Sequence, residues 1–346
     1  MDPQGVSARG RTATLADVAR LAGVSVGTAS KALNGRGQLR SETRSAVVAA
    51  AEKLGFTMNG VARALHSGRT YTVGLVATDD VGRFYFPVLL GAEDALGPGR
   101  IAVFLCDTRG DPVRERLYVD TLVGRRVDGL IVTGCVTDPR PPIDVPEGVP
   151  VVYAIAPSAD PRDASVTIDN ERAGRLAAEH LLGAGRRRIG CISGRDDQRS
   201  ATQRAESAAR VLAEAGLGLT GGAPRYGAWS EEWGRQAAHQ LLTVDPDLDA
   251  VICGSDQVAR GVIDTLEHAG RSVPGDVAVI GFDNWDVMAT GRSPALTTLD
   301  PQLELIGRRA AQRLLEAIDG RPSGGVETVA PSMVFRGSTG VPVAVP

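Results

Sequence analysis

The sequence predicts a multidomain protein, with a small all-α domain at the N-terminus and a larger α/β body in two lobes, each built on a doubly wound parallel sheet. Two helical patterns joined by a tight turn occupy residues 14–34. From residue 71 onward, apolar strand-like runs alternate with helical patterns in two successive series. Residues 1–70 contain ten Lys or Arg and four Asp or Glu, whereas the remainder contains 28 and 37. A length of 346 residues agrees with two or three domains.

The overall composition excludes several classes of protein. Hydrophobic residues make up 43% of the chain and charged residues 23%, which is typical of a globular protein. No apolar run approaches the length that spans a membrane. Residues 1–12, which we expect to be disordered, contain no apolar segment of a secretory signal. We therefore expect a cytoplasmic protein without a membrane partner. The four cysteines form no C-x-x-C motif and lie in or beside apolar runs, so we expect buried thiols: Cys106, Cys135, Cys191 and Cys253.

The first two helices carry local start and stop signals. Thr14 precedes the first helical pattern and Asp17 follows three positions later, which is the spacing of a capping box with Asp in place of Glu or Gln. Gly23 stands where a left-handed residue ends the helix, and Ser25 can cap a second helix over Val26–Leu33. Small residues let the two helices cross closely, as in a DNA-binding helix-turn-helix, although an ordinary helical hairpin has the same pattern. The excess of basic residues here favours a polyanionic partner.

A third helix and a short fourth segment follow. Ser41 can cap the third helix, in which Val47, Ala51 and Leu54 form a core stripe. Residues 59–66, NGVARALH, favour a helix that is too short to be stable alone, because isolated helices below about 12–15 residues are marginal. We expect this helix to form only on a partner. The alternative is a plain interdomain linker, in which exposed apolar residues would be unusual.

The body is expected to alternate strands and helices. Strand-like runs lie at 73–77, 101–105, 130–133, 151–153, 189–193, 250–253 and 277–282, and a last strand near 326–335. Helical patterns lie at 87–96, 113–125, 171–184, 202–215, 230–242, 257–269 and 303–317. Residues 295–302 are expected to form a segment that crosses between the lobes. Continuous apolar strands such as VGLVA and AVIGF agree with sheets that are covered on both faces.

The motif TLADVARLAGVSxxTASKALN at residues 14–34 is very similar to the N-terminal signature of the LacI/GalR family of bacterial transcription regulators. The similarity continues from Arg40 to Leu65. The resemblance implies a helix-turn-helix DNA-binding domain at 13–58, a hinge helix and linker at 59–70, and a ligand-binding and dimerisation core at 71–346. It also implies a homodimeric repressor that binds a near-palindromic, double-stranded operator.

The resemblance further implies the periplasmic-binding-protein type I architecture for the core, with a ligand cleft between the lobes. The chain would cross between the lobes near residues 165, 295 and 323. The first lobe would then comprise about 71–165 and 297–322, and the second about 166–296 and 323–340.

The same resemblance identifies residues that would contact DNA. The helix over Val26–Leu33 would lie in the major groove, with Val26 and Gly27 at the positions that choose bases. Since Gly27 has no side chain, we expect base choice to come from Val26 on a thymine methyl or from Lys31 on guanine. Leu65 would wedge between base pairs in the minor groove. The expected DNA contacts are Thr14, Ser25, Val26, Gly27, Thr28, Ser30, Lys31, Asn34, Asn59, Val61, Ala62, Leu65 and His66.

Candidate ligand contacts follow the ends of the predicted strands, because open α/β sheets bind ligands beyond their carboxyl ends. This rule selects Thr78, Asp79, Asp107, 195–200, Ser255, Asp256, Asp283 and Asn284. A sugar or similar polyol needs carboxylate acceptors, an Arg donor and an aromatic face, which Asp283, Arg204 and Trp229 can supply. The family resemblance supports an effector site of Tyr85, Asp107, Ser200, Arg204, Trp229, Ser255 and Asp283.

Several of these residues have structural alternatives. Asp256 can simply cap the helix at 257–269, Trp229 can pack within its lobe, and Phe86 is expected in the core. Ile155 stands where the family often has a polar residue, and Ser255 stands in place of Asn. These two departures argue against a standard hexose.

No catalytic motif is present. The sequence has no G-x-x-x-x-G-K-[ST] loop, no H-E-x-x-H and no G-x-S-x-G, and its four His are scattered without metal-ligand spacing. We therefore expect no catalytic residue, no metal and no cofactor. The alternative function is a periplasmic-type sugar-binding protein without a transcriptional role, but such a protein would lack the basic head.

Overall fold

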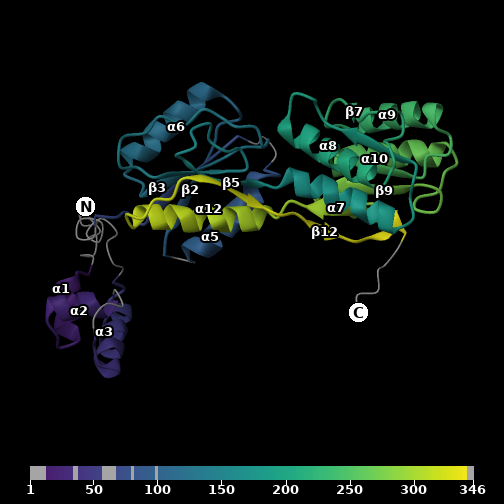
Figure 1. The fold of residues 1–346 in the computed structure, drawn as a ribbon. Coiled ribbons are helices and arrows are strands. Elements are labelled where there is room, and N and C mark those ends of the chain that lie inside the picture. Colours follow the sequence, from purple (N-terminus) through teal and green to yellow (C-terminus); the bar gives the residue numbers. More distant parts are fainter. Residues whose placement is uncertain (1–12, 34–37, 57–67, 79–81, 98–99, 341–346) are drawn as a thin grey trace, which may run out of the picture. The chain divides into compact units, whose positions relative to one another are not determined.

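The computed structural model describes residues 13–33, 38–56, 68–78, 82–97 and 100–340. The chain divides between Thr70 and Tyr71 into two compact units. The described part of the smaller unit contains three helices, which are α1 (Leu15–Leu21), α2 (Val26–Leu33) and α3 (Ser41–Lys53) (Figure 1).

The turn between α1 and α2 is built as its sequence predicts. The backbone N–H of Thr14 donates to Asp17 Oδ2 (3.0 Å), and the N–H of Asp17 donates to Thr14 Oγ1 (3.3 Å). These two bonds form the predicted capping box. Gly23 follows α1 with φ +68°, and Ser25 Oγ accepts a hydrogen bond from the N–H of Thr28 (3.1 Å) at the start of α2.

The core of this unit is small. Its buried side chains are Val18, Ala19, Ala29, Ala32, Val47, Ala50 and Ala51. Two predictions for α3 are wrong. The helix begins at Ser41 itself, and Arg40 occupies the N-cap without a side-chain hydrogen bond. Leu54 follows the last helical residue and is 36% exposed, because it lies beyond the turn that faces the core.

Six parallel strands form the sheet of the first lobe, in the order β11-β5-β4-β3-β1-β2. Their bounds are β1 Thr72–Ala77, β2 Ala102–Asp107, β3 Gly129–Thr133, β4 Val151–Ala154, β5 Ala164–Ile168 and β11 Gly325–Val329. One face is covered by α6 (Pro112–Gly124), and the other by α5 (Tyr85–Leu96) and α12 (Leu303–Ile318) (Figure 1). Burial on both faces explains the continuous apolar strands.

The second lobe repeats this plan, with the strand order β12-β10-β9-β8-β6-β7. Its strands are β6 Ile189–Ser193, β7 Arg225–Tyr226, β8 Ala250–Cys253, β9 Ala278–Phe282, β10 Thr297–Asp300 and β12 Ser332–Val334, the last antiparallel to β10. The side chains of α7 (Asn170–Gly183) and α8 (Arg199–Glu214) pack on one face, and those of α9 (Glu231–Val244) and α10 (Asp256–His268) on the other. A short helix, α11 (Asp286–Ala289), and a 3-10 turn, η1 (Gly337–Thr339), complete the lobe. The predicted two-lobed, doubly wound α/β fold is confirmed.

The crossings between the lobes differ from the predicted positions near 165, 295 and 323. The chain passes between the sheets after Ile168, Asp300 and Val329. The segment expected only to cross contains β10, and the single strand expected near 326–335 is two strands in different sheets. The sequence did not predict β10 because the strand contains polar residues. Thr297 and Thr298 are nevertheless fully buried, because Thr297 Oγ1 donates to the carbonyl oxygen of Arg336 and Thr298 Oγ1 donates to Asp256.

Two side chains that the sequence places in the interior are exposed. Phe86 is 54% exposed on α5, and Cys135, two residues after the end of β3, is also exposed. Cys106 is half-buried, whereas Cys191 and Cys253 are buried. None of the described helices combines the length and the apolar character that crossing a membrane requires.

Candidate functional site

A cavity of about 390 Å³ lies between the two lobes of the body. It is formed largely by segments that follow the carboxyl ends of strands and by the first turns of helices. This volume is near the lower end of the range for small-molecule pockets, about 300–1,000 Å³. The lining residues are Thr78, Arg83, Phe84, Cys135, Val136, Thr137, Ile155, Ile168, Gln198, Ser200, Arg204, Trp229, Ser255 and Asp283.

The cavity includes five of the seven side chains predicted for the effector site: Ser200, Arg204, Trp229, Ser255 and Asp283. Asp107 is not among the lining residues, because β2 is the edge strand of its sheet. Its carboxylate instead accepts a hydrogen bond from the N–H of Arg109 (2.9 Å). Tyr85 is also absent from the lining, and packs against the apolar core while its neighbour Phe84 lines the cavity. Asp79 lies outside the described residues.

Arg204 is a buried charged residue of the lining, with 9% exposure. Its Nε donates to Asn170 Oδ1 (2.8 Å) and its Nη1 to the carbonyl oxygen of Gly254 (2.8 Å). The guanidinium carbon lies 3.3 Å from the centre of the Phe282 ring. Burial, together with repulsion from the cation Arg83, lowers the pKa of Arg204 to about 9.

Close packing of two helices holds Arg204 in place. A Cβ atom on Gly174 of α7 would lie 2.0 Å from the carbonyl oxygen of Arg204 on α8, so only glycine permits this approach. The network also reaches the other lobe, because Asn170 Nδ2 donates to Thr137 Oγ1 (3.0 Å).

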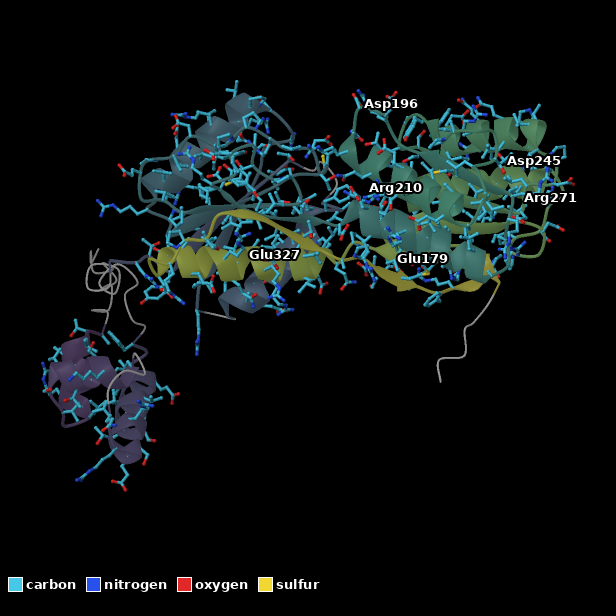
Figure 2. The ribbon with its side chains drawn as sticks, viewed as in Figure 1. Glu179, Asp196, Arg210, Asp245, Arg271 and Glu327 are labelled. Atoms are coloured by element: carbon cyan, nitrogen blue, oxygen red, sulfur yellow. The ribbon has the colours of Figure 1, made fainter. Side chains whose placement is uncertain are left out.

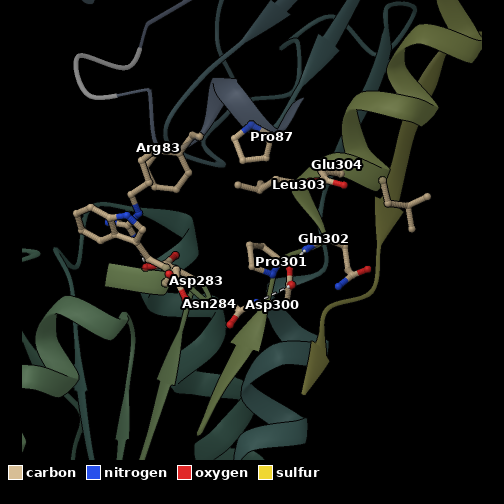
Figure 3. Close-up of a pocket in the computed structure, with 13 residues that line it drawn as sticks. Arg83, Pro87, Asp283, Asn284, Asp300, Pro301, Gln302, Leu303 and Glu304 are labelled. Carbon is tan, nitrogen blue, oxygen red and sulfur yellow. Dashed lines mark hydrogen bonds and ion pairs between the residues drawn. The ribbon is translucent and has the colours of Figure 1, made fainter. Parts of the chain in front are cut away.

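An ion pair joins the lobes at the edge of the cavity. Arg83 precedes α5 in the first lobe, Asp283 follows β9 in the second, and their side chains form an ion pair in which they are 16% and 8% exposed (Figure 3). The Arg83 guanidinium also lies over the rings of Phe84 (4.8 Å) and Trp285 (4.6 Å). Arg83 is not among the residues predicted from the sequence, although it directly precedes the aromatic run that opens α5.

The same ion pair borders a second cavity of about 360 Å³ (Figure 3). Arg83, Phe84 and Asp283 line both cavities. The rest of the second lining comes from Pro87 of α5, from Asn284, Trp285 and Asp286 after β9, and from residues 300–305, which lead from the end of β10 into α12. The ion pair therefore lies on the boundary between the two cavities.

The neighbouring residues Ser255 and Asp256 have different roles. Ser255 caps α10, since its Oγ accepts a hydrogen bond from the N–H of Val258 (3.2 Å). The alternative that Asp256 caps this helix is therefore wrong. Asp256 is fully buried and accepts hydrogen bonds from Thr298 Oγ1 and from the N–H of Trp285 (2.8 Å). Burial raises the pKa of its carboxyl to about 7.

Trp229 lines the cavity and also packs within its own lobe. A Cβ on Gly194 would lie 2.0 Å from the indole ring, which shows how closely the ring rests on the backbone after β6. The indole Nε1 donates to Gln198 Oε1 (2.5 Å). Both interpretations of this residue therefore agree with its position.

Ile155 forms part of an apolar wall, with Val136 and Ile168. It is 1% exposed and has φ +68°, a conformation that is unfavourable for a β-branched residue. Its backbone is held from both sides, because its N–H donates to the carbonyl oxygen of Val166 (2.9 Å) and its own carbonyl accepts a bond from Thr167 Oγ1 (2.5 Å). The strain is thus maintained by the surrounding sheet.

The candidate DNA-binding face lies on α2. Val26 is 49% exposed, and Gly27 and Lys31 are exposed as well. Ser25 and Thr28 are joined by a hydrogen bond between their hydroxyls (2.9 Å). Thr14 is exposed but bonded to Asp17, and Ser30 is half-buried. The other expected contacts, Asn34, Asn59, Val61, Ala62, Leu65 and His66, lie outside the described residues, as does the expected hinge helix.

Within the described ranges, no group of three or more His, Cys, Asp or Glu side chains is placed to hold a metal ion.

Comparison with known proteins divides the chain in a similar way. Residues 14–59 match the bacterial regulatory proteins of the lacI family, and residues 153–339 match the periplasmic binding protein-like domain. The chain is 35% identical over 329 residues to the HTH-type transcriptional regulator CelR of Thermobifida fusca, covering 93% of this chain and 96% of that protein. It is 32% identical over 309 residues to the ribose operon repressor of Escherichia coli (strain K12), covering 88% and 93%.

Solved structures of transcriptional regulators have the same fold. A complex of the transcriptional regulator CelR with cellobiose has a TM-score of 0.65 and 31% identity, covering 94% of this chain and 99% of that chain. The lac repressor dimer bound to operator and the anti-inducer ONPF has a TM-score of 0.70 and 26% identity, covering 95% and 99%. These relatives are regulators and not enzymes. A capped helix-turn-helix followed by two lobes around a cavity, together with these matches over nearly the whole chain, establishes that the protein belongs to the lacI family of bacterial regulatory proteins.

Proposed function

We propose that the protein is a transcriptional repressor that binds a near-palindromic operator as a homodimer and responds to a small polar effector, a sugar or related polyol, between its lobes. The observation that carries the proposal is the presence, in one chain, of a helix-turn-helix and of a cavity lined by both lobes of the body. Its place of action would be the bacterial cytoplasm, where the chromosome lies.

On the DNA side, α2 would enter the major groove. Its exposed residues leave few side chains to read bases, because Gly27 has none and Ser25 and Thr28 are hydrogen-bonded to each other. Val26 would contact a thymine methyl and Lys31 would contact guanine or phosphate. The wedge role of Leu65 rests on the sequence resemblance alone.

An exposed apolar face on the first lobe supports a homodimer. The edge strand β2 has Phe104 (43% exposed) and Leu105 (41%), although strands of this fold are normally covered. The helices before and after this strand carry further exposed apolar side chains, each pair one helical turn apart: Phe86 and Leu90 on α5, and Val113 and Leu117 on α6. A second copy related by a two-fold axis would cover this face and would match the symmetry of a palindromic operator.

The cavity supports control by a ligand. Two interactions join the lobes beside it, the ion pair of Arg83 with Asp283 and the hydrogen bond of Asn170 with Thr137. A molecule bound among these groups would favour one spacing of the lobes over another, and its differential affinity would appear as a change in operator affinity. The complex of CelR with cellobiose supports a sugar as the effector class.

Two measurements test the proposal. Selection from random double-stranded DNA by the full-length protein should enrich a near-palindromic site. A thermal-shift screen of sugars, polyols and nucleosides should then find a compound that raises the melting temperature by mass action and changes operator affinity. Enrichment of an asymmetric site, or ligands that stabilise the protein without altering operator affinity, would contradict it.

A pair of carboxylate variants locates the ligand. Asp283→Asn, in the cavity, should weaken the response to the effector. Asp107→Asn, outside the cavity lining, should respond as the unaltered protein does. Equal responses of the two variants would exclude the cavity as the effector site.

A further inference from the structure

The cavity between the lobes has an excess of positive charge. Among the described residues, its charged lining consists of Arg83, Arg204 and Asp283. Arg83 and Asp283 neutralise each other in the ion pair that joins the lobes. Of the charged residues in the described lining, Arg204 is therefore the one that forms no ion pair with another lining residue.

Arg204 differs in this respect from cations on the outside of the same lobe. Arg210 pairs with Glu171 (3.0 Å) and Arg188 with Asp245 (2.5 Å), and the labelled Arg210 and Asp245 lie on the surface of the lobe (Figure 2). The partners of Arg204 are the neutral oxygens of Asn170 and Gly254, and no ion pair joins it to a carboxylate in the described part of the chain.

A buried cation with neutral partners is an unfavourable arrangement. Removal from water destabilises the charged form unless an anion compensates. The lowered pKa of Arg204 has the same cause. The charge of Asp256 offsets this cost in part, since it raises the pKa of Arg204. Because Arg204 also lines the cavity, an anion bound there would supply further compensation.

Two helix starts in the second lobe add to the positive potential. Ser200 in the first turn of α8 and Ser255 at the N-cap of α10 both line the cavity. The N-terminal end of a helix carries a partial positive charge and free N–H donors. The start of α8 already binds one carboxylate of the protein, since the N–H of Arg199 donates to Asp138 Oδ1 (3.0 Å). Asp138 is not among the residues that line the cavity.

Part of the cavity wall is apolar. This part is formed by Val136, Ile155 and Ile168, and the sole carboxylate in the described lining is already bonded to Arg83. Hydroxyl groups that face this wall would lose hydrogen bonds to water without replacement. The cavity is thus better suited to a ligand with one polar, charged end and a less polar body.

We propose that the effector carries a carboxylate or phosphate group and that this oxyanion binds beside Arg204, at the starts of α8 and α10. The inference deepens the proposed function and rests on it, because it assigns a chemical class to the effector of the same cavity. Carboxylate and phosphate share the required chemistry, a compact oxyanion with several acceptor oxygens.

Adding a carboxylate to the cavity wall tests the proposal. Ile155→Asp would compensate Arg204 from within the protein, and Ile155→Asn is its neutral control of equal size. Asp and Asn both tolerate the φ of +68° better than isoleucine does. A second pair, Cys135→Asp and Cys135→Ser, uses an exposed lining position where a new polar group is not forced into the interior.

The first measurement uses inorganic phosphate and acetate as probes. The melting temperature of the full-length protein and of the four variants is followed at constant ionic strength, with chloride as the reference. The apparent affinity for one anion should be about tenfold or more weaker in each Asp variant than in its neutral control. The phosphate and acetate arms distinguish the two headgroups. General salt effects act on all variants alike, so equal shifts in both pairs would overturn the proposal.

The second measurement compares glucose with gluconate, glucuronate and glucose 6-phosphate, both by melting temperature and by operator affinity. A preference for one of the acidic compounds, reversed in Ile155→Asp, supports the proposal. A response to glucose that exceeds the response to all three would leave the proposed function intact and would overturn the anionic class. If the anion probes show no difference within either pair and no sugar changes operator affinity, both the inference and the ligand-controlled function fail.

Discussion

Breaking the ion pair between Arg83 and Asp283 should destabilise the body where its lobes meet. The two side chains are 16% and 8% exposed, so the pair resembles a buried ion pair more than a surface pair. Removal of one partner from a buried pair costs about 3–5 kcal/mol, whereas exposed pairs contribute about 0–1 kcal/mol. Because Arg83 retains some contact with water, we expect a loss of about 2–3 kcal/mol for Arg83→Met or for Asp283→Asn.

A double-mutant cycle isolates the pair from the other contacts of each residue. We expect a coupling energy of about 1–3 kcal/mol between Arg83→Met and Asp283→Asn, measured from the free energy of unfolding of the body. Each single variant should also melt about 4–12 °C lower, since 1 kcal/mol shifts the melting temperature of a domain of 150–250 residues by about 2–4 °C.

A surface pair provides the control for this cycle. Arg195 and Asp197 are 2.5 Å apart, but their side chains are 62% and 58% exposed. The same cycle with Arg195→Met and Asp197→Asn should give a much smaller coupling energy, because water screens an exposed pair. If the coupling between Arg83 and Asp283 is no larger than this control value, the ion pair does not hold the lobes together, and the reasoning from burial is refuted.

Three further outcomes are expected. Gly174→Ala should lower the free energy of unfolding by about 1–3 kcal/mol and disturb Arg204, because the new Cβ would overlap the neighbouring helix. In the control Gly183→Ala, in the same helix, the new Cβ meets no atom within 4 Å, so this variant should be neutral or stabilising. Equal unfolding free energies of the two variants would contradict this reasoning. Burial holds the folded-state pKa of Asp256 at about 7. This exceeds its unfolded value of about 3.9, so the contribution of Asp256 to stability falls as the pH rises from about 4 to about 7. Asp256→Asn should therefore reduce the loss of melting temperature over this range, and an unchanged pH profile would count against it. Leu65→Ala should weaken binding to the operator more than binding to bulk DNA in a competition assay, and an equal loss would argue against a wedge in the minor groove.

The sequence predicted most of the fold because its strands are apolar runs between helical patterns. VGLVA at β1 and AVIGF at β9 are buried on both faces, and such runs are recognisable without tertiary information. β10 was missed for the opposite reason. Its threonines are buried only because Asp256, Arg336 and the residues of η1 lie opposite them, and those partners are brought together by the completed fold.

The lining of the cavity was predicted in part, and the differences have physical causes. The strand-end rule selected Asp283, which lines the cavity because β9 is a central strand, and it also selected Asp107, which lies outside the lining because β2 is at the edge of the sheet. Phe84 rather than Tyr85 lines the cavity, since the rotation of α5 is set by its packing on the core. Arg83 has no local signal, because its partner is 200 residues away in the sequence.

The path of the chain determines which parts of the protein can be exchanged as units. Each lobe is assembled from separated segments, because the chain changes lobe after Ile168, Asp300 and Val329. A chimera that replaced one lobe with that of a relative would therefore need a compatible junction at every crossing. The N-terminal unit is joined to the body at one point, between Thr70 and Tyr71. Exchange of the helix-turn-helix unit therefore needs a single junction, whereas exchange of one lobe needs a junction at each of the three crossings.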